Sequence, residues 1–354
     1  MPDGADGGGC PSRRDPGELS IAALDGGERP VTPILEWLLD SPEPSIVWKT
    51  RVEVLGEVPD PDLGEAIRQS PRVQALRAGV PTGNVYNKWH GAHWVLASLA
   101  DLGYPCGDDA LIPLRERVLV TWLAPSYFTH FEAGSQRTAY NGEGVPLTHG
   151  RFRRCASQQG NALWSLHRLG LADGRCQQLV ERLLHWQWPD GGWNCDKNPA
   201  ADTSSFMETL LPMRGLAAHA AATGDPMALD GAHRAAEVFL SRRLFRRRRG
   251  GEVIHPEFLA LHHPLYWHYD ILGGLKGLAE LGMLGDFRCA EALDLLEEKR
   301  LPDGGWPAEK QYYSVSREPA SGSEAVDWGG TGKKKVNPWV TAAALAILTA
   351  AGRM

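Results

Sequence analysis

The sequence of 354 residues has no long apolar run, no closely spaced cysteine pair and no excess of basic charge. No apolar run approaches the roughly 18 residues that a membrane-spanning helix needs, so we expect no transmembrane segment. The formal net charge is −6, which argues against nucleic acid as a partner, because phosphate backbones attract basic surfaces. The six cysteines lack CxxC spacing, so we expect reduced thiols in a cytoplasmic protein instead of a disulfide framework.

The N-terminus also lacks the apolar segment of a signal peptide. Residues 1–30 are rich in glycine, proline and charge, and we expect them to form a disordered leader. The remaining chain has the composition of a globular protein with a large core, since 43% of all residues are hydrophobic. We therefore expect residues 31–354 to form a single domain.

No segment shows the alternation of a β-strand, whereas many segments have helical periodicity. Six of them are mostly apolar and close on a glycine, which suits a left-handed helix C-cap. These six segments are 45–56, 86–103, 155–170, 204–224, 266–282 and 337–352. Small and aromatic residues on most of their faces predict buried inner helices.

A second set of helices lies between them and has one apolar stripe and one charged face, as solvent-facing outer helices do. Its segments are 33–40, 61–78, 108–124, 174–188, 228–245 and 289–300. Six alternating pairs at a period of about 50 residues predict an all-α fold, an (α/α)6 barrel or toroid with an inner and an outer ring. The polar, Gly/Ser-rich stretch at about 311–336 is expected to be a long loop covering the cavity mouth.

Two outer segments end alike, in WQWPDGGW (Trp186–Trp193) and KRLPDGGW (Lys299–Trp306). Proline stops the helix, aspartate caps a turn, glycine supplies positive φ, and tryptophan packs back against the helices, so we interpret both motifs as structural. This repeat resembles the terpenoid cyclase and protein prenyltransferase α/α-toroid superfamily, in which squalene cyclases carry a comparable repeat. The resemblance implies an enzyme that acts on a small or isoprenoid substrate in the central cavity.

The resembling class II cyclases use the central aspartate of a DxDD-type motif as their acid, and this sequence has no such motif. Asp60, Asp62, Asp108 and Asp109 lie at the starts of outer helices, where helix capping explains them. A proton-initiated squalene-type cyclase is therefore not expected.

The resembling prenyltransferases hold zinc with an Asp-x-Cys element and a later histidine. Asp202 matches the aspartate, Ser204 stands where the cysteine belongs, and His268 matches the histidine. Cys195 could supply the missing thiolate, with Asp196 as a substitute carboxylate. The resemblance thus implies a tentative zinc site of Cys195, Asp202 and His268 with one open position.

Reactive side chains gather near the N-terminal ends of the inner helices, where free N–H groups favour anionic ligands. Such groups are costly to bury unless they are paired or used in chemistry. The candidate catalytic residues are His268, Asp270, Glu208 and His90. The candidate substrate-binding residues are Trp89, His93, Cys155, Trp267 and Tyr269. Simpler roles stay open: His90 and His93 could bond to neighbours, and Glu208 could neutralise Arg214 or Lys49.

Two other functions fit the same pattern. The aromatic residues could stack on sugar rings, and Glu208 with Asp270 could form the carboxylate pair of an (α/α)6 glycosidase or a related lyase. A non-catalytic helical-repeat protein that captures a ligand in its cavity is the third hypothesis.

Overall fold

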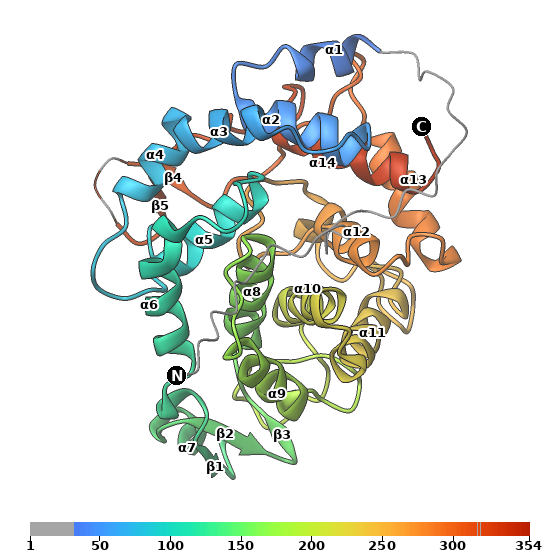
Figure 1. Ribbon diagram of the computed structural model, residues 1–354. Helices are drawn as coiled ribbons and strands as arrows, with labels where there is room; N and C mark the ends of the chain where they lie inside the picture. The colour runs from blue at the N-terminus through green and yellow to red at the C-terminus, as the bar shows by residue number, and fades with distance from the viewer. Residues whose placement is uncertain (1–31, 317, 319) are drawn as a thin grey trace.

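The computed structural model describes residues 32–354 except 317 and 319, so the expected leader at 1–30 lies outside the described residues. The described chain is mostly helical, as the sequence predicts, and contains helices α1 to α14 (Figure 1). None of these helices is both long enough and apolar enough to cross a membrane.

Each of the six segments expected to form inner helices contains a helix. They are α2 (Pro44–Trp48) with the π-helix η1 (Lys49–Val54), α5 (Ala92–Asp101), α8 (Ala156–Arg168), α10 (Phe206–Thr223), α12 (Ile271–Glu280) and α14 (Pro338–Ala350). The glycines that close these segments all have φ between 64° and 75°, as the C-cap pattern predicts. Helices α5, α8, α10, α12 and α14 pack in that order, and α14 packs on η1 beside α2 (Figure 1).

The outer segments are helical as well. They are α1 (Pro33–Leu39), α3 (Pro61–Gln69), α4 (Pro71–Ala78), α6 (Ile112–Trp122), α9 (Cys176–Trp186), α11 (Pro226–Leu240) and α13 (Ala290–Glu298). The buried residues of α9 show the amphipathic pattern, with Leu179, Leu183 and Trp186 on one face. Asp60 caps α3 by accepting the N–H of Asp62. Asp108 accepts the N–H of Ala110 at the start of the 3-10 turn that precedes α6. Both aspartates therefore have the structural role expected of them.

The expectation of no strands is wrong, because the structure contains two small sheets. Strands β1 (His130–Glu132), β2 (Val145–Thr148) and β3 (Arg151–Phe152) form one sheet, with β1 parallel and β3 antiparallel to β2. Strands β4 (Ser314–Val315) and β5 (Ser323–Glu324) pair in parallel within the segment expected to be a loop. Strands of two to four residues are too short to show a period of two.

Short helices complete the description. They are α7 (Gln136–Asn141), which lies beside the first sheet in Figure 1, and the 3-10 turns η2 (Asp109–Leu111), η3 (Pro125–Tyr127), η4 (Pro256–Leu259) and η5 (Phe287–Cys289).

The two DGGW motifs make the same contacts. The indole N–H of Trp193 donates to Leu183 O on α9 at 2.9 Å, and its backbone N–H donates to Thr209 Oγ1 on α10. Trp306 repeats both bonds, to a carbonyl of α13 at 2.7 Å and to a threonine of α14 at 2.9 Å. Each motif thus ties an outer helix to the next inner helix, which confirms the structural interpretation of the repeat.

Candidate functional site

A cavity lies among the inner helices. Its walls come from α5, α8, α10, α12 and α14, from residues 262–266, and from Trp328 in the segment predicted to cover the mouth. Aromatic side chains supply much of the surface. They are Trp94, Trp164, Tyr266, Trp328 and Trp339. This lining is that of a pocket for a small, mostly apolar ligand.

The two cationic side chains that line this cavity are both neutralised. Arg214 makes two hydrogen bonds to Glu280, at 2.7 and 2.6 Å, and its guanidinium lies 4.2 Å from the ring centroid of Trp164. Lys276 donates to Asp101 at 2.6 Å. Burial opposes ionisation of Asp101, but Lys276 and a second lysine outweigh burial and hold the pKa of this carboxyl well below its usual range.

Asp270 and His262 form a buried pair in the cavity wall. The Nδ1 atom of His262 lies 2.9 Å from Asp270 Oδ2, and the exposed fraction of each side chain is 1%. The same carboxylate oxygen accepts the backbone N–H of His262 at 2.9 Å, and the other oxygen accepts Gly273 N–H at 2.7 Å. Asp270 therefore caps α12 and orients the imidazole at the same time.

The pairing fixes how His262 can act. Its Nδ1 faces two acceptors, Asp270 Oδ2 and the carbonyl of Ala260, so Nδ1 carries a proton. Its Nε2 is buried and makes no hydrogen bond to any described residue. Burial disfavours the imidazolium, but the Asp270 carboxylate outweighs burial and raises the pKa of His262. Nε2 is therefore the acid–base nitrogen of a residue that lines an aromatic cavity.

Asp270 was predicted as a candidate catalytic residue, and its partner in the structure is His262. His262 was not among the predicted site residues, although HHPLYWHYD places His262 and His263 eight and seven residues before the aspartate. His268 stacks on Tyr312 with ring centroids 3.5 Å apart and on Trp267 at 4.1 Å. Burial lowers the pKa of His268 to about 3, so its ring is neutral at ordinary pH.

The other candidates near the inner helix starts have separate partners. The ring of Trp89 stacks on Tyr266 at 3.7 Å. His90 hydrogen-bonds to Ser323 at 2.9 Å, whereas His93 contacts Trp122 and Asn161, so the two histidines share no ligand position. The Tyr269 hydroxyl donates to Leu244 O, and its ring packs against three phenylalanines, Phe206, Phe239 and Phe258. Trp89 therefore borders a cavity residue, and Tyr269 packs away from the cavity.

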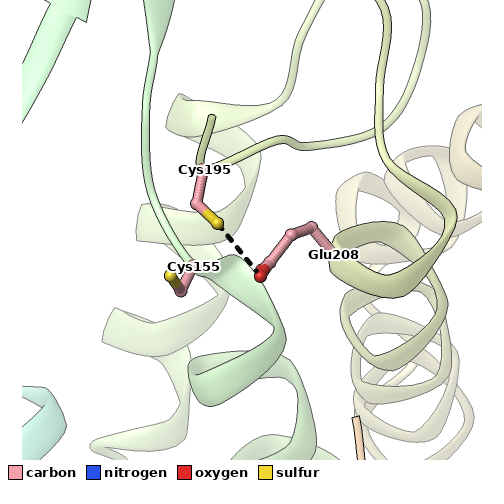
Figure 2. A group of neighbouring side chains, drawn as sticks. All are labelled: Cys155, Cys195 and Glu208. Atoms are coloured by element: carbon pink, nitrogen blue, oxygen red, sulfur yellow. Dashed lines mark hydrogen bonds between the residues drawn. The ribbon is translucent and has the colours of Figure 1, made fainter. Parts of the chain in front are cut away.

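A second cluster joins Cys155, Cys195 and Glu208. Cys155 is the N-cap residue of α8, Glu208 lies in the first turn of α10, and Cys195 comes from the loop that follows the first DGGW motif. Both sulfurs and a carboxylate oxygen lie within 4.8 Å of one another. Figure 2 shows Cys195 and Glu208 pointing toward each other, with Sγ 3.3 Å from Oε1, and Cys155 beside them.

Two groups of this cluster, Cys195 and Glu208, have raised pKa values. A hydrogen bond with Cys155, and then burial and Glu208, raise the pKa of Cys195. Burial raises the pKa of Glu208, although Ser157 N–H donates to its Oε2 at 3.1 Å. The three side chains are half-buried, and thiolates and carboxylates are ligand types that zinc prefers.

The predicted trio of Cys195, Asp202 and His268 is wrong in two of its members. Asp202 is exposed in the loop before α10, and His268 packs between aromatic rings. In the part of the chain that the structure describes, one group of three potential ligands converges, and it unites Cys195 with Cys155 and Glu208. The three side chains converge through tertiary contacts between α8, α10 and the loop that precedes α10. Spacing along the sequence does not reveal these contacts.

No protein-family model matches the chain, and no curated protein matches it. Among solved structures, a crystal structure of a protein from Actinoplanes is similar, with a TM-score of 0.41 and 16% sequence identity. The similarity covers 86% of this chain and 89% of that chain. A likeness of this degree assigns neither a family nor a function.

Proposed function

We propose that this chain is a toroid enzyme of the terpenoid cyclase and prenyltransferase-like kind, which transfers a proton to or from a small, uncharged, isoprenoid-like substrate. The observation that carries the proposal is His262. Its Nδ1 is held by Asp270, its Nε2 makes no hydrogen bond to any described residue, and it lines an aromatic cavity. A buried polar atom without a partner is costly, and a bound substrate would supply the partner.

The packing order of the inner helices supports the toroid. Each of α5 to α14 in the inner set contacts the next, and α14 contacts η1. Asp101 at the end of α5 joins Lys276 of α12 and Lys49 of η1, at 2.6 and 3.5 Å. A salt-bridge network therefore connects η1, α5 and α12, which belong to the first, second and fifth inner segments.

The lining supports an uncharged substrate. Tryptophan and tyrosine faces pack well on isoprenoid chains and attract developing positive charge. The cations in the wall, Arg214 and Lys276, already have carboxylate partners, so the cavity offers no free cation for a diphosphate. An alcohol or alkene with its reacting group near His262 fits this charge distribution best.

The chemistry follows from the orientation of the imidazole. With Nδ1–H donating to Asp270, the lone pair on Nε2 can accept a proton, and the carboxylate stabilises the imidazolium that forms. The protonated ring can return the proton to another substrate atom. Asp270 is a positioning residue in this scheme, because both its oxygens are already occupied by His262 and Gly273.

A glycosidase with Glu208 and Asp270 as its carboxylate pair is less well supported. Asp270 lines the cavity, whereas Glu208 is held by Cys195 and Ser157 outside the cavity lining. Zinc, the cofactor implied by the resemblance, stays part of the proposal. Its ligands in the described chain would be Cys155, Cys195 and Glu208.

The test is deuterium transfer from solvent. Purified protein is incubated in D2O with a panel of C10 and C15 isoprenoid alcohols, and the recovered material is analysed by mass spectrometry. We expect products or recovered substrate with deuterium on carbon for wild type, and a loss of about 100-fold or more in rate for His262→Gln.

His219→Gln is the matched control, since His219 is a buried histidine of α10 bonded to His167 and Gln177. It is expected to retain the wild-type rate. Binding without any deuterium transfer by wild type would favour the non-catalytic binding protein, and equal rates in wild type and His262→Gln would refute the role of His262.

A further inference from the structure

Cys155, Cys195 and Glu208 converge where α8 and α10 begin, although Cys155 and Glu208 lie 53 residues apart in the sequence. We infer that Cys155, Cys195 and Glu208 bind one divalent cation of the zinc class and leave one coordination position open. This inference does not depend on the role of His262, because none of the three ligands lines the cavity that contains the histidine.

The separations suit a tetrahedral cation. Two thiolate sulfurs on zinc stand about 3.8 Å apart, and a sulfur and a carboxylate oxygen about 3.6 Å apart, given metal bonds of about 2.3 and 2.1 Å. The Cys195 sulfur lies 3.3 Å from Glu208 Oε1, and all three ligand atoms lie within 4.8 Å of one another. Cys155 lies beside the other two in Figure 2, and its side chain would have to turn for all three atoms to reach these separations.

A second layer of contacts holds the carboxylate. Ser157 N–H, in the first turn of α8, donates to Glu208 Oε2, and the other oxygen faces Cys195. One oxygen is thus fixed by the backbone while the other faces the proposed cation. Ligating carboxylates in metal sites are commonly oriented in this way by an outer hydrogen bond.

The local charge also balances. Two thiolates and a carboxylate exceed the charge of a divalent cation by one, and Arg154, which precedes Cys155, lies within electrostatic reach of all three ligands. Its guanidinium donates to Gln158 at 2.9 Å and lies 4.6 Å from the ring centroid of Tyr127, while its Nε has no partner among the described residues. One fixed cation beside the site therefore compensates the excess negative charge.

A tyrosine hydroxyl lies near the three proposed ligands. Tyr86 interacts electrostatically with Cys155, Cys195 and Glu208, and its ring packs on Trp94, which lines the central cavity. Three protein ligands with a vacant fourth position are typical of a catalytic zinc site, whereas structural sites have four protein ligands. A water or a thiol is the chemical class of ligand that this position would take.

The experiment uses the untagged full chain, purified under reducing conditions after zinc-replete expression. Elemental mass spectrometry should find about one zinc per chain. After chelation, titration with Co²⁺ should produce the thiolate-to-cobalt absorption and the visible bands of a tetrahedral site, saturating at one equivalent. Cys155→Ser and Cys195→Ser should each lower the thiolate absorption per cobalt by about half and weaken Co²⁺ binding by at least about 10-fold.

Glu208→Gln should weaken binding but keep both sulfur ligands, so the thiolate absorption per bound cobalt should persist. Cys106→Ser, at an exposed position outside the cluster, should leave metal content and spectrum unchanged. Circular dichroism of each variant confirms that it is folded. Absence of stoichiometric metal together with no thiolate absorption in wild type would overturn the inference, as would rapid loss of both thiols to a Cys155–Cys195 disulfide in metal-replete protein.

Discussion

His262 is held in a position that costs free energy unless something binds to it. Its side chain is almost fully buried, one nitrogen is committed to Asp270, and the other has no partner among the described residues. An unsatisfied buried polar atom costs about 1–3 kcal/mol. Because His262 also lines a cavity, this cost is the reason, at the scale of a single residue, for assigning chemistry to it.

The Asp270 carboxylate should govern the titration of His262. Because the pKa of His262 is raised in the folded state, its ion pair stabilises the fold fully below the unfolded value of about 6.5, and this stabilisation is lost as pH rises through the folded-state value. Asp270→Asn should remove it. The difference in unfolding free energy between wild type and Asp270→Asn, from urea titrations between about pH 5.5 and about pH 9, should therefore shrink as pH rises.

His263 serves as the internal contrast for this experiment. Burial lowers its pKa to about 3, so its contribution to stability falls as pH decreases, which is the opposite direction. His263→Gln should not abolish the shrinking difference between wild type and Asp270→Asn. A difference that stayed constant across the range would mean that Asp270 does not control His262.

Of His262 and Asp270, only Asp270 was predicted from the sequence as a site residue. Asp270 was predicted as a candidate catalytic residue together with His268, but His262 was not predicted. Local spacing could not place His262 because the chain between them turns back, so that a residue eight positions earlier reaches the aspartate. The same holds for the second cluster, where Cys195 was singled out but its partners depend on the packing of α8 against α10.

At the scale of elements, each DGGW motif connects an outer helix to an inner helix through hydrogen bonds. Trp193→Phe and Trp306→Phe each remove an indole N–H that donates to a buried helix carbonyl. Each substitution should lower the unfolding free energy by about 1–3 kcal/mol, and by similar amounts because the contacts are equivalent. Urea denaturation followed by circular dichroism measures both.

Trp37→Phe supplies the control, since Trp37 of α1 is 47% exposed. It should change the unfolding free energy by less than about 0.5 kcal/mol. If Trp193→Phe or Trp306→Phe lowered the unfolding free energy as little as Trp37→Phe, the motifs would not stabilise the packing of these helices.

Elements were the most predictable level of the structure. Helical periodicity and terminal glycines located six pairs of helical segments, because amphipathic faces and C-caps are local properties. The strands were missed because β1 to β5 are very short, and the partners in the two parallel pairs lie 15 and 9 residues away. The polar segment at 311–336 still reaches the cavity, through Trp328.

At the scale of the whole molecule, one carboxylate links distant parts of the chain. Asp101 of α5 contacts Lys276 of α12 and Lys49 of η1. Asp101→Asn would leave both lysines without this partner, and because Asp101 and Lys276 are only half-buried, the cost should lie between the about 0–1 kcal/mol of a surface pair and the about 3–5 kcal/mol of a buried pair. The free energy of unfolding should fall by that amount, and adding Lys276→Met should recover part of it.

Asp230→Asn tests whether the loss is specific to the buried network. Asp230 pairs with Arg234 on the exposed face of α11, and such surface pairs contribute about 0–1 kcal/mol. Equal effects of the Asp101 and Asp230 substitutions would show that the network does not hold the inner helices together.

The central claim is that the free nitrogen of His262 faces a substrate in the aromatic cavity. The most direct measurement is ¹⁵N NMR of histidine-labelled protein during addition of farnesol, an uncharged isoprenoid alcohol. The account predicts that the Nε2 signal of His262 shifts with saturation while the signals of His219, a buried histidine of α10, stay in place. Binding of farnesol without any change at His262, or no binding of farnesol at all, would contradict it.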